Sequence, residues 1–483
     1  MAHRPPPSFR LRFIVLLGCA GTFAGCASTP KAQSFNRVQS ITEERLGKRV
    51  EWNGHTTDDR AAAASVNELL SRPLTVDAAV QIALLNNHKL QATFEELGIA
   101  QADFVQAGLL QNPVFSLNVR FPTQPPSKTY LDIGAVENFL NVFLIPARRK
   151  IAAAELDRVT ARVTDEVLSL AAQTKAAYFD YQAAKQTLEL RQTIADASAA
   201  SLDAATRLRQ AGNTTELDYY AKRTQAARAT VDVMNAKADV ADARERLNAL
   251  MGVWGRQIEW NIAERLPDLP ADEVRPEGLE NLAIQNRQDL AAARQDILVQ
   301  ARTYGFTVDT RFFAQADLGL EGERETDGQW RIGPSLAVPV PLFDQGQAAI
   351  PRAAAVLRQS QERYAALAVE IRSQVRAARN RMLNARSTAS YYHDEVLPTQ
   401  QHYLEQAQLQ YNGMFVSVFQ LLEAKRDEID AAVQYIKALR TYWTSRTELE
   451  RAVGGRLPPG EPIQPASRPT TAPSDKRENG NQP

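Results

Sequence analysis

Apolar and polar residues alternate strictly over two pairs of short segments. Every second residue is apolar in residues 115–121, and after a turn-rich segment the alternation resumes at Tyr130. The same arrangement recurs at residues 314–321 and 330–342, on either side of a turn at residues 324–329. A period of two is that of a β-strand, so the pattern predicts one antiparallel hairpin in each half of the chain.

Most of the remaining chain has the three-to-four-residue apolar spacing of helices. Residues 75–110 are predicted to form one helix. Residues 147–211 contain neither Pro nor Gly and predict a second helix, on the order of 100 Å long at about 1.5 Å per residue. Its apolar positions form a coiled-coil seam. The chain then turns at residues 212–214 and is predicted to return as a helix to about Leu250.

A second long helical hairpin is predicted near the end of the chain. It runs from about Gln347 to Tyr411, turns at Asn412 and Gly413, and returns to about Val453. Pro398 interrupts this second hairpin. Because proline lacks the amide hydrogen that a helix needs, a kink or break is expected near Leu397.

The two halves are copies of one large unit. Gln173 aligns with Gln374, 201 positions later, and Gly212 aligns with Gly413 at the same offset. This period is far longer than the roughly 20–50 residues of a solenoid repeat. We therefore divide the chain into repeat 1, residues 74–265, and repeat 2, residues 275–456.

The N-terminus has the sequence pattern of an export signal. Basic residues precede an apolar run, Phe13–Gly25, which is too short to cross a membrane as a helix. Residues 1–25 are predicted to be a signal peptide. The residues ending at Cys26 resemble a bacterial lipobox, which predicts lipidation of Cys26; the alternative is an ordinary signal peptide cut nearby. Residues 26–73 would form a lipid-anchored lead-in, extended or partly ordered.

The composition of the chain argues against several classes of function and structure. Lys and Arg number 56 and Asp and Glu number 56, so no net field favours nucleic acid. With Cys19 removed, at most one cysteine is left and no intramolecular disulfide is expected. No later stretch has about 18 consecutive apolar residues, so no transmembrane helix is predicted. The tail, residues 457–483, is rich in Pro and polar residues and is predicted to be disordered.

Two equivalent hairpins in an exported chain are typical of a transmembrane β-barrel. The alternative is a small antiparallel sheet with one wet face. Four strands are too few for a closed barrel, which needs about eight. An open edge in lipid would leave backbone groups unpaired at a cost of several kcal/mol each, so we expect the chain to oligomerise through its strands.

The duplication, with one strand hairpin and one long helical hairpin per copy, resembles the TolC-like outer-membrane efflux protein family over roughly residues 74–456. Residues 340–346 are similar to the family's strand-to-helix junction. Residues 411–413 and 419–424 are similar to its periplasmic tip. The resemblance implies a mainly α-helical fold with a β-barrel part. It would be a homotrimer with a long coiled-coil helical barrel and a twelve-stranded transmembrane barrel, held in outer-membrane lipid.

The resemblance also implies a function. The protein would be the exit duct of a tripartite efflux pump, with a periplasmic adaptor (membrane fusion) protein and an inner-membrane efflux pump as partners. It would conduct passively, without a catalytic residue, a cofactor or a metal. The cargo would be drugs or other small solutes, or heavy-metal cations, because residues 110–113 resemble a form common in heavy-metal efflux members. Five Met and five His argue against a dedicated metal-binding path.

The resemblance implies that four positions of this chain correspond to the family's periplasmic gate. Its acidic pair falls at Gln420 and Glu423, of which only Glu423 keeps a charge. Tyr411 matches the tip tyrosine, and Asp218 lies near the position of its first-copy partner. Three copies of Glu423 in a narrow pore would attract cations; the alternative is a solvated coiled-coil flank.

The adaptor contacts are expected at the two helical turns. The first turn holds Gly212, Asn213 and Thr214, and the second holds Gly413, Met414 and Phe415. The alternative for these residues is simple packing of the helical hairpins. Because Pro398 and Glu423 distinguish repeat 2 from repeat 1, the moving gate is expected in repeat 2.

Rival functions explain less of the chain. A structural coiled-coil spacer lipoprotein accounts for the helices but not for alternating strands in both copies. A periplasmic adaptor gives no reason for two equivalent long hairpins. An enzyme is disfavoured because the sequence has no phosphate loop, no metal-spaced His/Cys cluster and no nucleophile elbow.

Overall fold

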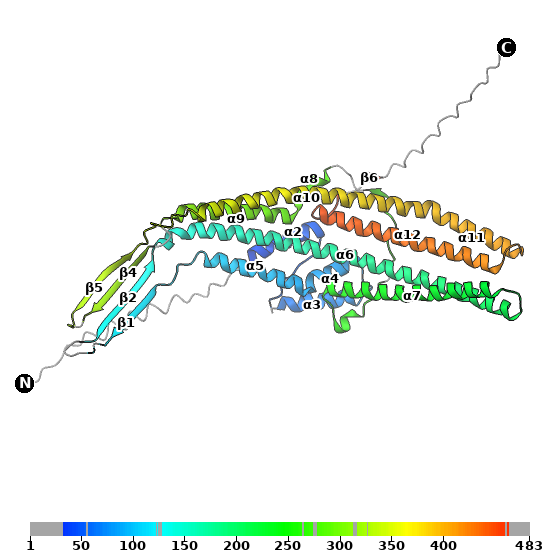
Figure 1. Ribbon diagram of the computed structural model, residues 1–483, viewed down its shortest axis with the longest axis horizontal. Helices are drawn as coiled ribbons and strands as arrows, with labels where there is room; N and C mark the ends of the chain where they lie inside the picture. The colour runs from blue at the N-terminus through cyan, green and yellow to red at the C-terminus, as the bar shows by residue number, and fades with distance from the viewer. Residues whose placement is uncertain are drawn as a thin grey trace, which may run out of the picture. The chain divides into compact units, whose positions relative to one another are not determined.

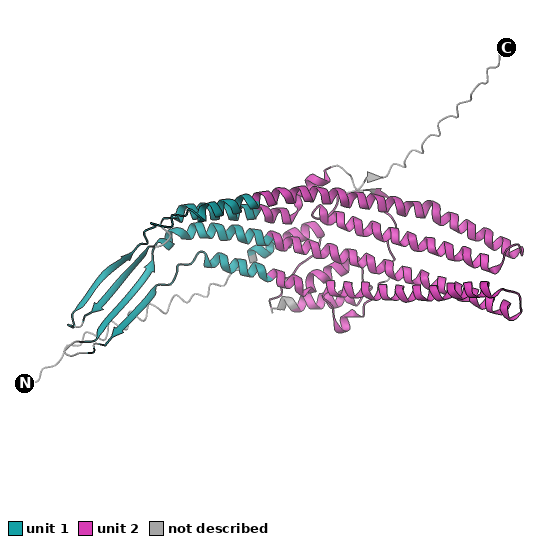
Figure 2. Ribbon diagram, in the orientation of Figure 1, with its two compact units in different colours: residues 1–38, 95–160, 295–360 teal, residues 39–94, 161–294, 361–483 magenta. Residues whose placement is uncertain are grey.

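The chain is predominantly helical with one four-stranded sheet (Figure 1). This computed structural model describes residues 32–54, 57–121, 123, 128–262, 265–273, 278–312, 316–325, 327–458 and 461–462. The predicted signal peptide, Cys26 and most of the predicted tail lie outside these residues. Two compact units each combine segments from both halves (Figure 2). Unit 1 comprises residues 1–38, 95–160 and 295–360, and unit 2 comprises residues 39–94, 161–294 and 361–483.

The sheet, in unit 1, contains both predicted hairpins. β1 (Val114–Arg120) pairs with β2 (Tyr130–Asn138), and β4 (Asp317–Arg324) pairs with β5 (Trp330–Ala337). The order is β1-β2-β4-β5 with antiparallel neighbours, so the pairing of β2 with β4 joins the two halves of the chain. The hairpin predictions are confirmed, and β1 and β5 are the edges of this sheet.

One face of the sheet is apolar across all four strands. The register places Leu117 opposite Ile133 and Leu320 opposite Pro334, and residues on the other face are mainly polar or Gly. The apolar face consists of Phe115, Leu117, Val119, Leu131, Ile133, Ala135, Leu318, Leu320, Ile332, Pro334 and Leu336. Phe115 is 76% exposed and Ile332 is 73% exposed. Such a continuous exposed apolar face is suited to lipid rather than water.

The first long helical hairpin follows the sheet directly. α6 (Leu140–Gln210) is one helix of 71 residues, and α7 (Glu216–Met251) returns antiparallel to it in Figure 1. The absence of Gly and of further Pro after Pro146 lets the hydrogen-bond ladder of α6 continue without a break. The predicted hairpin is confirmed, and α6 starts earlier than predicted because it includes Pro146 near its beginning.

The second long helical hairpin is interrupted. α10 (Ala349–Tyr391) passes through a π-helical turn, η2 (Tyr392–Val396), into α11 (Leu397–Asn412). Pro398 lies at the start of α11, as the predicted break near Leu397 requires. A π-turn inserts an extra residue into the ladder and accommodates the missing amide of proline. α12 (Val418–Ala452) completes the hairpin.

The predicted single helix over residues 75–110 is wrong, because the structure has two helices there. α4 (Val76–Asn86) and α5 (His88–Gln106) are separated at Asn87, whose backbone is extended. The Asn87 side-chain amide donates to the Leu250 carbonyl at 2.8 Å, so the break serves to cap the end of α7. Repeat 2 has the equivalent break at Arg287, between α8 (Leu279–Asn286) and α9 (Gln288–Thr310).

The lead-in segment is also more ordered than predicted. It forms α2 (Ala32–Leu46) and α3 (Thr57–Leu70). In the last turn of α2, the Arg45 guanidinium donates to the Gly454 carbonyl at 2.9 Å and to the Asn286 carbonyl, at the ends of α12 and α8. These contacts satisfy helix-terminal carbonyls that have no intrahelical partner, which explains why this polar segment is ordered.

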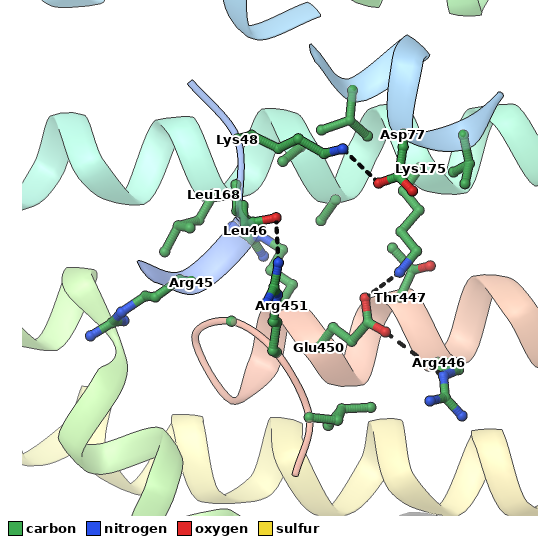
Figure 3. A pocket seen from close by; sticks show the side chains of 17 residues that line it. Arg45, Leu46, Lys48, Asp77, Leu168, Lys175, Arg446, Thr447, Glu450 and Arg451 are labelled. Carbon is green, nitrogen blue, oxygen red and sulfur yellow. Dashed lines mark hydrogen bonds and ion pairs between the residues drawn. The ribbon is translucent and has the colours of Figure 1, made fainter. Parts of the chain in front are cut away.

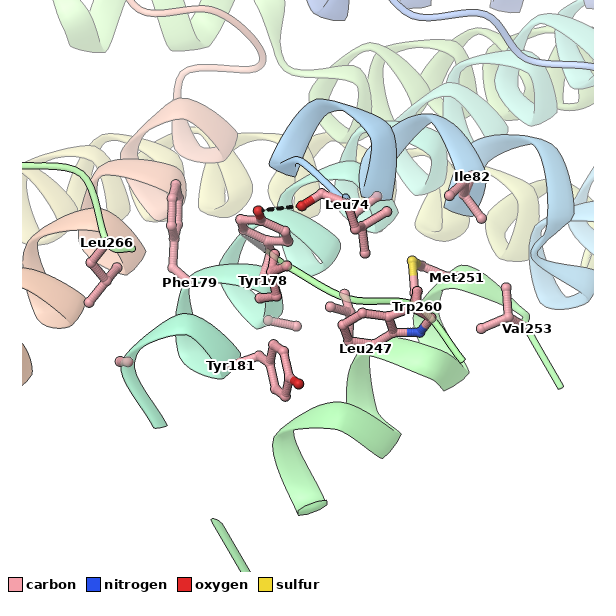
Figure 4. Close-up of a cluster of buried hydrophobic side chains, with 14 of the residues drawn as sticks. Leu74, Ile82, Tyr178, Phe179, Tyr181, Leu247, Met251, Val253, Trp260 and Leu266 are labelled. Carbon is pink, nitrogen blue, oxygen red and sulfur yellow. Dashed lines mark hydrogen bonds between the residues drawn. The ribbon is translucent and has the colours of Figure 1, made fainter. Parts of the chain in front are cut away.

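Two large hydrophobic cores lie in unit 2. In the cluster of Figure 4, the Trp260 indole is 1% exposed and its Nε1 donates to Asn248 Oδ1 at 2.8 Å. The Tyr178 hydroxyl donates to the Leu74 carbonyl at 2.8 Å. Both aromatic residues therefore bury their rings while their polar atoms stay paired, which avoids the cost of an unsatisfied buried donor.

The remaining elements are short. They are η1 (Gly255–Ile258), β3 (Asp272–Glu273) and β6 (Glu461–Pro462), and β3 pairs with β6. The pairing of β6 gives Glu461 and Pro462, which lie within the predicted disordered tail, a regular structure. Among the described residues, no helix has the length and apolar character needed to cross a membrane.

Asp165 of α6 is a titratable group held in unit 2. Its carboxyl is half-buried near Arg287, whose Nε donates to Asp289 Oδ1 at 2.9 Å. Burial, followed by the neighbouring Asp289 carboxylate, raises the pKa of Asp165 above its ordinary value, while Arg451 and Arg287 oppose the rise. The folded protein therefore binds a proton at Asp165 more tightly than the unfolded chain does.

We expect Asp165→Asn to increase the free energy of unfolding at pH 7. A carboxyl with a raised folded-state pKa favours folding at low pH, and this contribution is lost as the pH rises through that pKa. The neutral amide should therefore be stabilising at pH 7, with the gain vanishing below about pH 4. Denaturant unfolding at both pH values measures this, and exposed Asp203→Asn is the control. A gain that persists unchanged below pH 4 contradicts the assignment.

Candidate functional site

The first helical tip is built around a helix cap. Gly212 adopts a φ of +74°, which favours glycine, in the turn after α6. At the start of α7, the Asp218 amide donates to Thr215 Oγ1 at 3.0 Å, and the Thr215 hydroxyl donates to Asp218 Oδ2 at 2.7 Å. Asp218 is thus exposed at the tip, with its carboxylate held by the N-cap residue.

The second helical tip exposes two large apolar side chains. Met414 is 93% exposed and Phe415 is 84% exposed, in the turn between α11 and α12. Met414 has a φ of +62°, the only positive value outside glycine among the described residues. Such a conformation is uncommon for a residue with a Cβ and is typical of functional turns. Gly413 precedes them and ends α11.

Gln420 and Glu423 have different surroundings at the start of α12. Gln420 Oε1 accepts from the Ser417 amide at 3.1 Å and completes a capping box. Glu423 is half exposed, 3.6 Å from Arg426, and lines a narrow crevice with Lys222 of α7. The structure therefore places Glu423 among cations, while Gln420 also has a role in the cap.

Tyr411 lies in the last turn of α11 and is partly exposed. In the part of the chain that the structure describes, no hydrogen bond joins Tyr411 to Asp218. The four predicted gate residues thus lie at the two tips, but within one chain they do not form a single bonded cluster.

An ion-pair layer that joins α6, α7 and α12 was not predicted from the sequence. Arg191 of α6 lies 2.7 Å from Asp430 of α12 and 4.0 Å from Asp232 of α7, so three helices meet at one guanidinium. Ile194 and Ile429 pack beside it. The sequence did contain a signal for this layer. Arg191 follows Leu188, an apolar residue of the α6 seam, by three residues and therefore lies on the packed face of α6.

These features indicate a surface that is suited to protein contacts and to the attraction of ions. The tips combine exposed apolar groups, caps and paired charges. Among the described residues, no group of three or more His, Cys, Asp or Glu side chains is arranged to hold a metal ion.

Comparison with protein families gives a match in each half of the chain. The family model for outer membrane efflux proteins matches residues 79–253 and, a second time, residues 279–455. The two matches together cover well over half of the chain and contain both long helical hairpins and all four sheet strands.

Individual proteins are similar over most of their lengths. The cobalt-zinc-cadmium resistance protein CzcC of Cupriavidus metallidurans is 25% identical over 389 residues, which are 79% of this chain and 90% of CzcC. A membrane protein from Pseudomonas aeruginosa has a similar structure, with a TM-score of 0.66, 19% identity, and coverage of 78% and 92%. The open state of the MtrE outer membrane channel of Neisseria gonorrhoeae has a TM-score of 0.63, 19% identity, and coverage of 79% and 89%.

Proposed function

Because the chain belongs to the outer membrane efflux protein family, we propose that three copies of it form the exit duct of a tripartite efflux system. The observation that carries the proposal is the four-stranded sheet with one apolar, exposed face and two edges, β1 and β5. Three such sheets would close a twelve-stranded barrel and pair every edge. Residues 74–265 and 275–456 would act as two repeats, each supplying one strand hairpin and one helical hairpin.

The duct would be passive. Its partners would be an inner-membrane pump, which supplies the energy, and a periplasmic adaptor. Met414 and Phe415, the most exposed apolar residues at the tips, support an adaptor contact there, because exposed apolar groups mark protein interaction sites. Gly212, Asn213, Thr214 and Gly413 would shape the same contact surface.

Glu423 would set the ion preference of the periplasmic end. Three copies would bring three carboxylates to one constriction and favour cations. Its position beside Arg426 and Lys222 supports a role in holding the helices together when the end is closed. Asp218, Tyr411 and Gln420 would contribute to the same end, Gln420 through the cap of α12.

Planar-bilayer recording of the detergent-extracted protein tests both the duct and the gate. We expect ion-conducting trimers, and we expect Glu423→Gln to lower the cation-to-anion permeability ratio severalfold without loss of trimers, because three charges leave the constriction. Glu405→Gln, an exposed carboxylate change on α11, is the control. A protein that forms no conducting trimer would instead be a structural spacer lipoprotein.

Cys26 would anchor the mature chain to the membrane through a diacylglycerol. The lipobox-like residues Phe23-Ala24-Gly25 before it support this, and one acyl-modified residue adds membrane affinity without spanning the bilayer. Intact mass of the mature protein should show a lipid-modified N-terminal cysteine, and Cys26→Ser should abolish the modification. An unmodified mature N-terminus in the wild type refutes the anchor.

Divalent metal cations are a second candidate cargo. The specific observation in their favour is the similarity to CzcC, which is named for cobalt, zinc and cadmium resistance. A strain lacking this gene should become sensitive to salts of these metals and recover when the gene is supplied. Sensitivity to dyes and antibiotics alone, with metal tolerance unchanged, would exclude metals in favour of organic solutes.

A further inference from the structure

A cavity of about 360 Å³ lies in unit 2, where the end of α2 and the residues after it meet α4, α6 and α12 (Figure 3). Six cationic side chains and only two carboxylates line it, although the whole chain has equal numbers of each sign. The cations are Arg45, Lys48, Lys175, Arg446, Arg451 and Arg456, and the carboxylates are Asp77 and Glu450. The positive charge is therefore concentrated at this cavity.

Three of the six cations have strong partners of their own. Lys48 lies 2.7 Å from Asp77, and the Lys175 ammonium donates to Glu450 at 2.6 Å. Arg45 caps the two helix ends described above and points away from the other labelled cations in Figure 3. The two lysine pairs use both carboxylates of the cavity.

The other three cations are guanidinium groups with little compensation. Arg446 donates to the Tyr442 hydroxyl and lies 3.7 Å from the already paired Glu450. Arg456 donates to a neutral backbone carbonyl, that of Leu46, at 3.1 Å, and has no carboxylate partner among the described residues. Within the described residues, the Arg451 guanidinium has no hydrogen bond and no carboxylate within ion-pair distance, and its compensation is the longer-range attraction to Asp165. Like charges gathered around one hollow repel one another, so an anion in the hollow would be stabilised.

The rest of the wall is aliphatic. Leu46, Val76, Val80, Leu168 and Leu457 line the same cavity. Guanidinium forks match the oxygen geometry of phosphate, while aliphatic side chains favour an apolar group beside it. The cavity thus offers complementary surfaces to the two ends of an amphiphilic molecule.

We propose that this cavity binds an amphiphilic phosphate: a phosphate group held by Arg446, Arg451 and Arg456, with an attached apolar part on the aliphatic wall. The source of such a group is an anionic phospholipid or a small organic phosphate. None of the tip or gate residues lines the cavity, so the proposal does not depend on how the duct opens.

Binding is measured with the full-length protein in a nonionic detergent, by native mass spectrometry and thermal shift. The probes are short-chain phosphatidylglycerol, glycerol 3-phosphate and inorganic phosphate. Phosphatidylcholine, a zwitterionic lipid with no net charge, is the control. We expect phosphatidylglycerol to bind at least about tenfold more tightly than phosphatidylcholine, and we expect salt to weaken its binding.

Two variants that change the charge of the cavity in opposite directions distinguish an effect on binding from an effect on folding. Arg451→Gln should weaken phosphatidylglycerol binding about tenfold, because it removes a charged donor without breaking an internal pair. Glu450→Gln should strengthen binding, because it frees Lys175 and removes a repelling carboxylate. Arg207→Gln, an exposed arginine paired with Asp203 elsewhere on α6, is the matched control and should change nothing.

Each outcome decides the proposal. Binding of glycerol 3-phosphate as tight as that of phosphatidylglycerol supports the site and identifies a small organic phosphate as its ligand source. Equal binding of phosphatidylglycerol and phosphatidylcholine overturns it, as does the absence of binding by every probe. Equal losses in Arg451→Gln and Arg207→Gln also overturn it, since the effect would then reflect overall charge.

Discussion

Backbone hydrogen bonding at the edges of the sheet is the constraint on which the rest of this molecule depends. The sheet has an apolar face suited to lipid, and lipid supplies no water for the unpaired amides and carbonyls of β1 and β5. A single chain therefore has an incomplete membrane part. Copies must join edge to edge, and that requirement makes the barrel a property of the assembly rather than of the fold of one chain.

In repeat 1 the sheet leads directly into a long helix, so the pairing of the strands also positions that helix. β2 ends at Asn138 and α6 begins at Leu140, so the start of α6 is fixed by the sheet register. In repeat 2 the connection is longer, because β5 ends at Ala337 and α10 begins at Ala349. The pairing of β2 with β4 ties the two repeats together. Where the returning helices α7 and α12 end, Asn87 and Arg287 mark matching breaks between α4 and α5 and between α8 and α9. The two repeats therefore share these helix breaks as well as the long helices.

Local patterns were sufficient for the strands, the long helices and the break near Pro398, because each depends on periodicity or on a missing amide. The break at Asn87 could not be predicted in this way, because its compensation comes from α7, more than 160 residues away in the chain. Gln420 was expected only as a gate residue, yet its side chain completes a cap with Ser417. The Arg191 layer depends on which helices meet, and no single segment encodes that.

The two repeats also differ in how rigid their helices are. α6 has an unbroken ladder after Pro146, whereas α10 and α11 are joined through a π-turn beside Pro398. A π-turn is a local weakness in the i to i−4 ladder, so bending costs less there than in a regular helix. α12 is tied to α6 and α7 through Arg191. We therefore infer that α11 and the tip that follows it move most easily, which supports a gate in repeat 2.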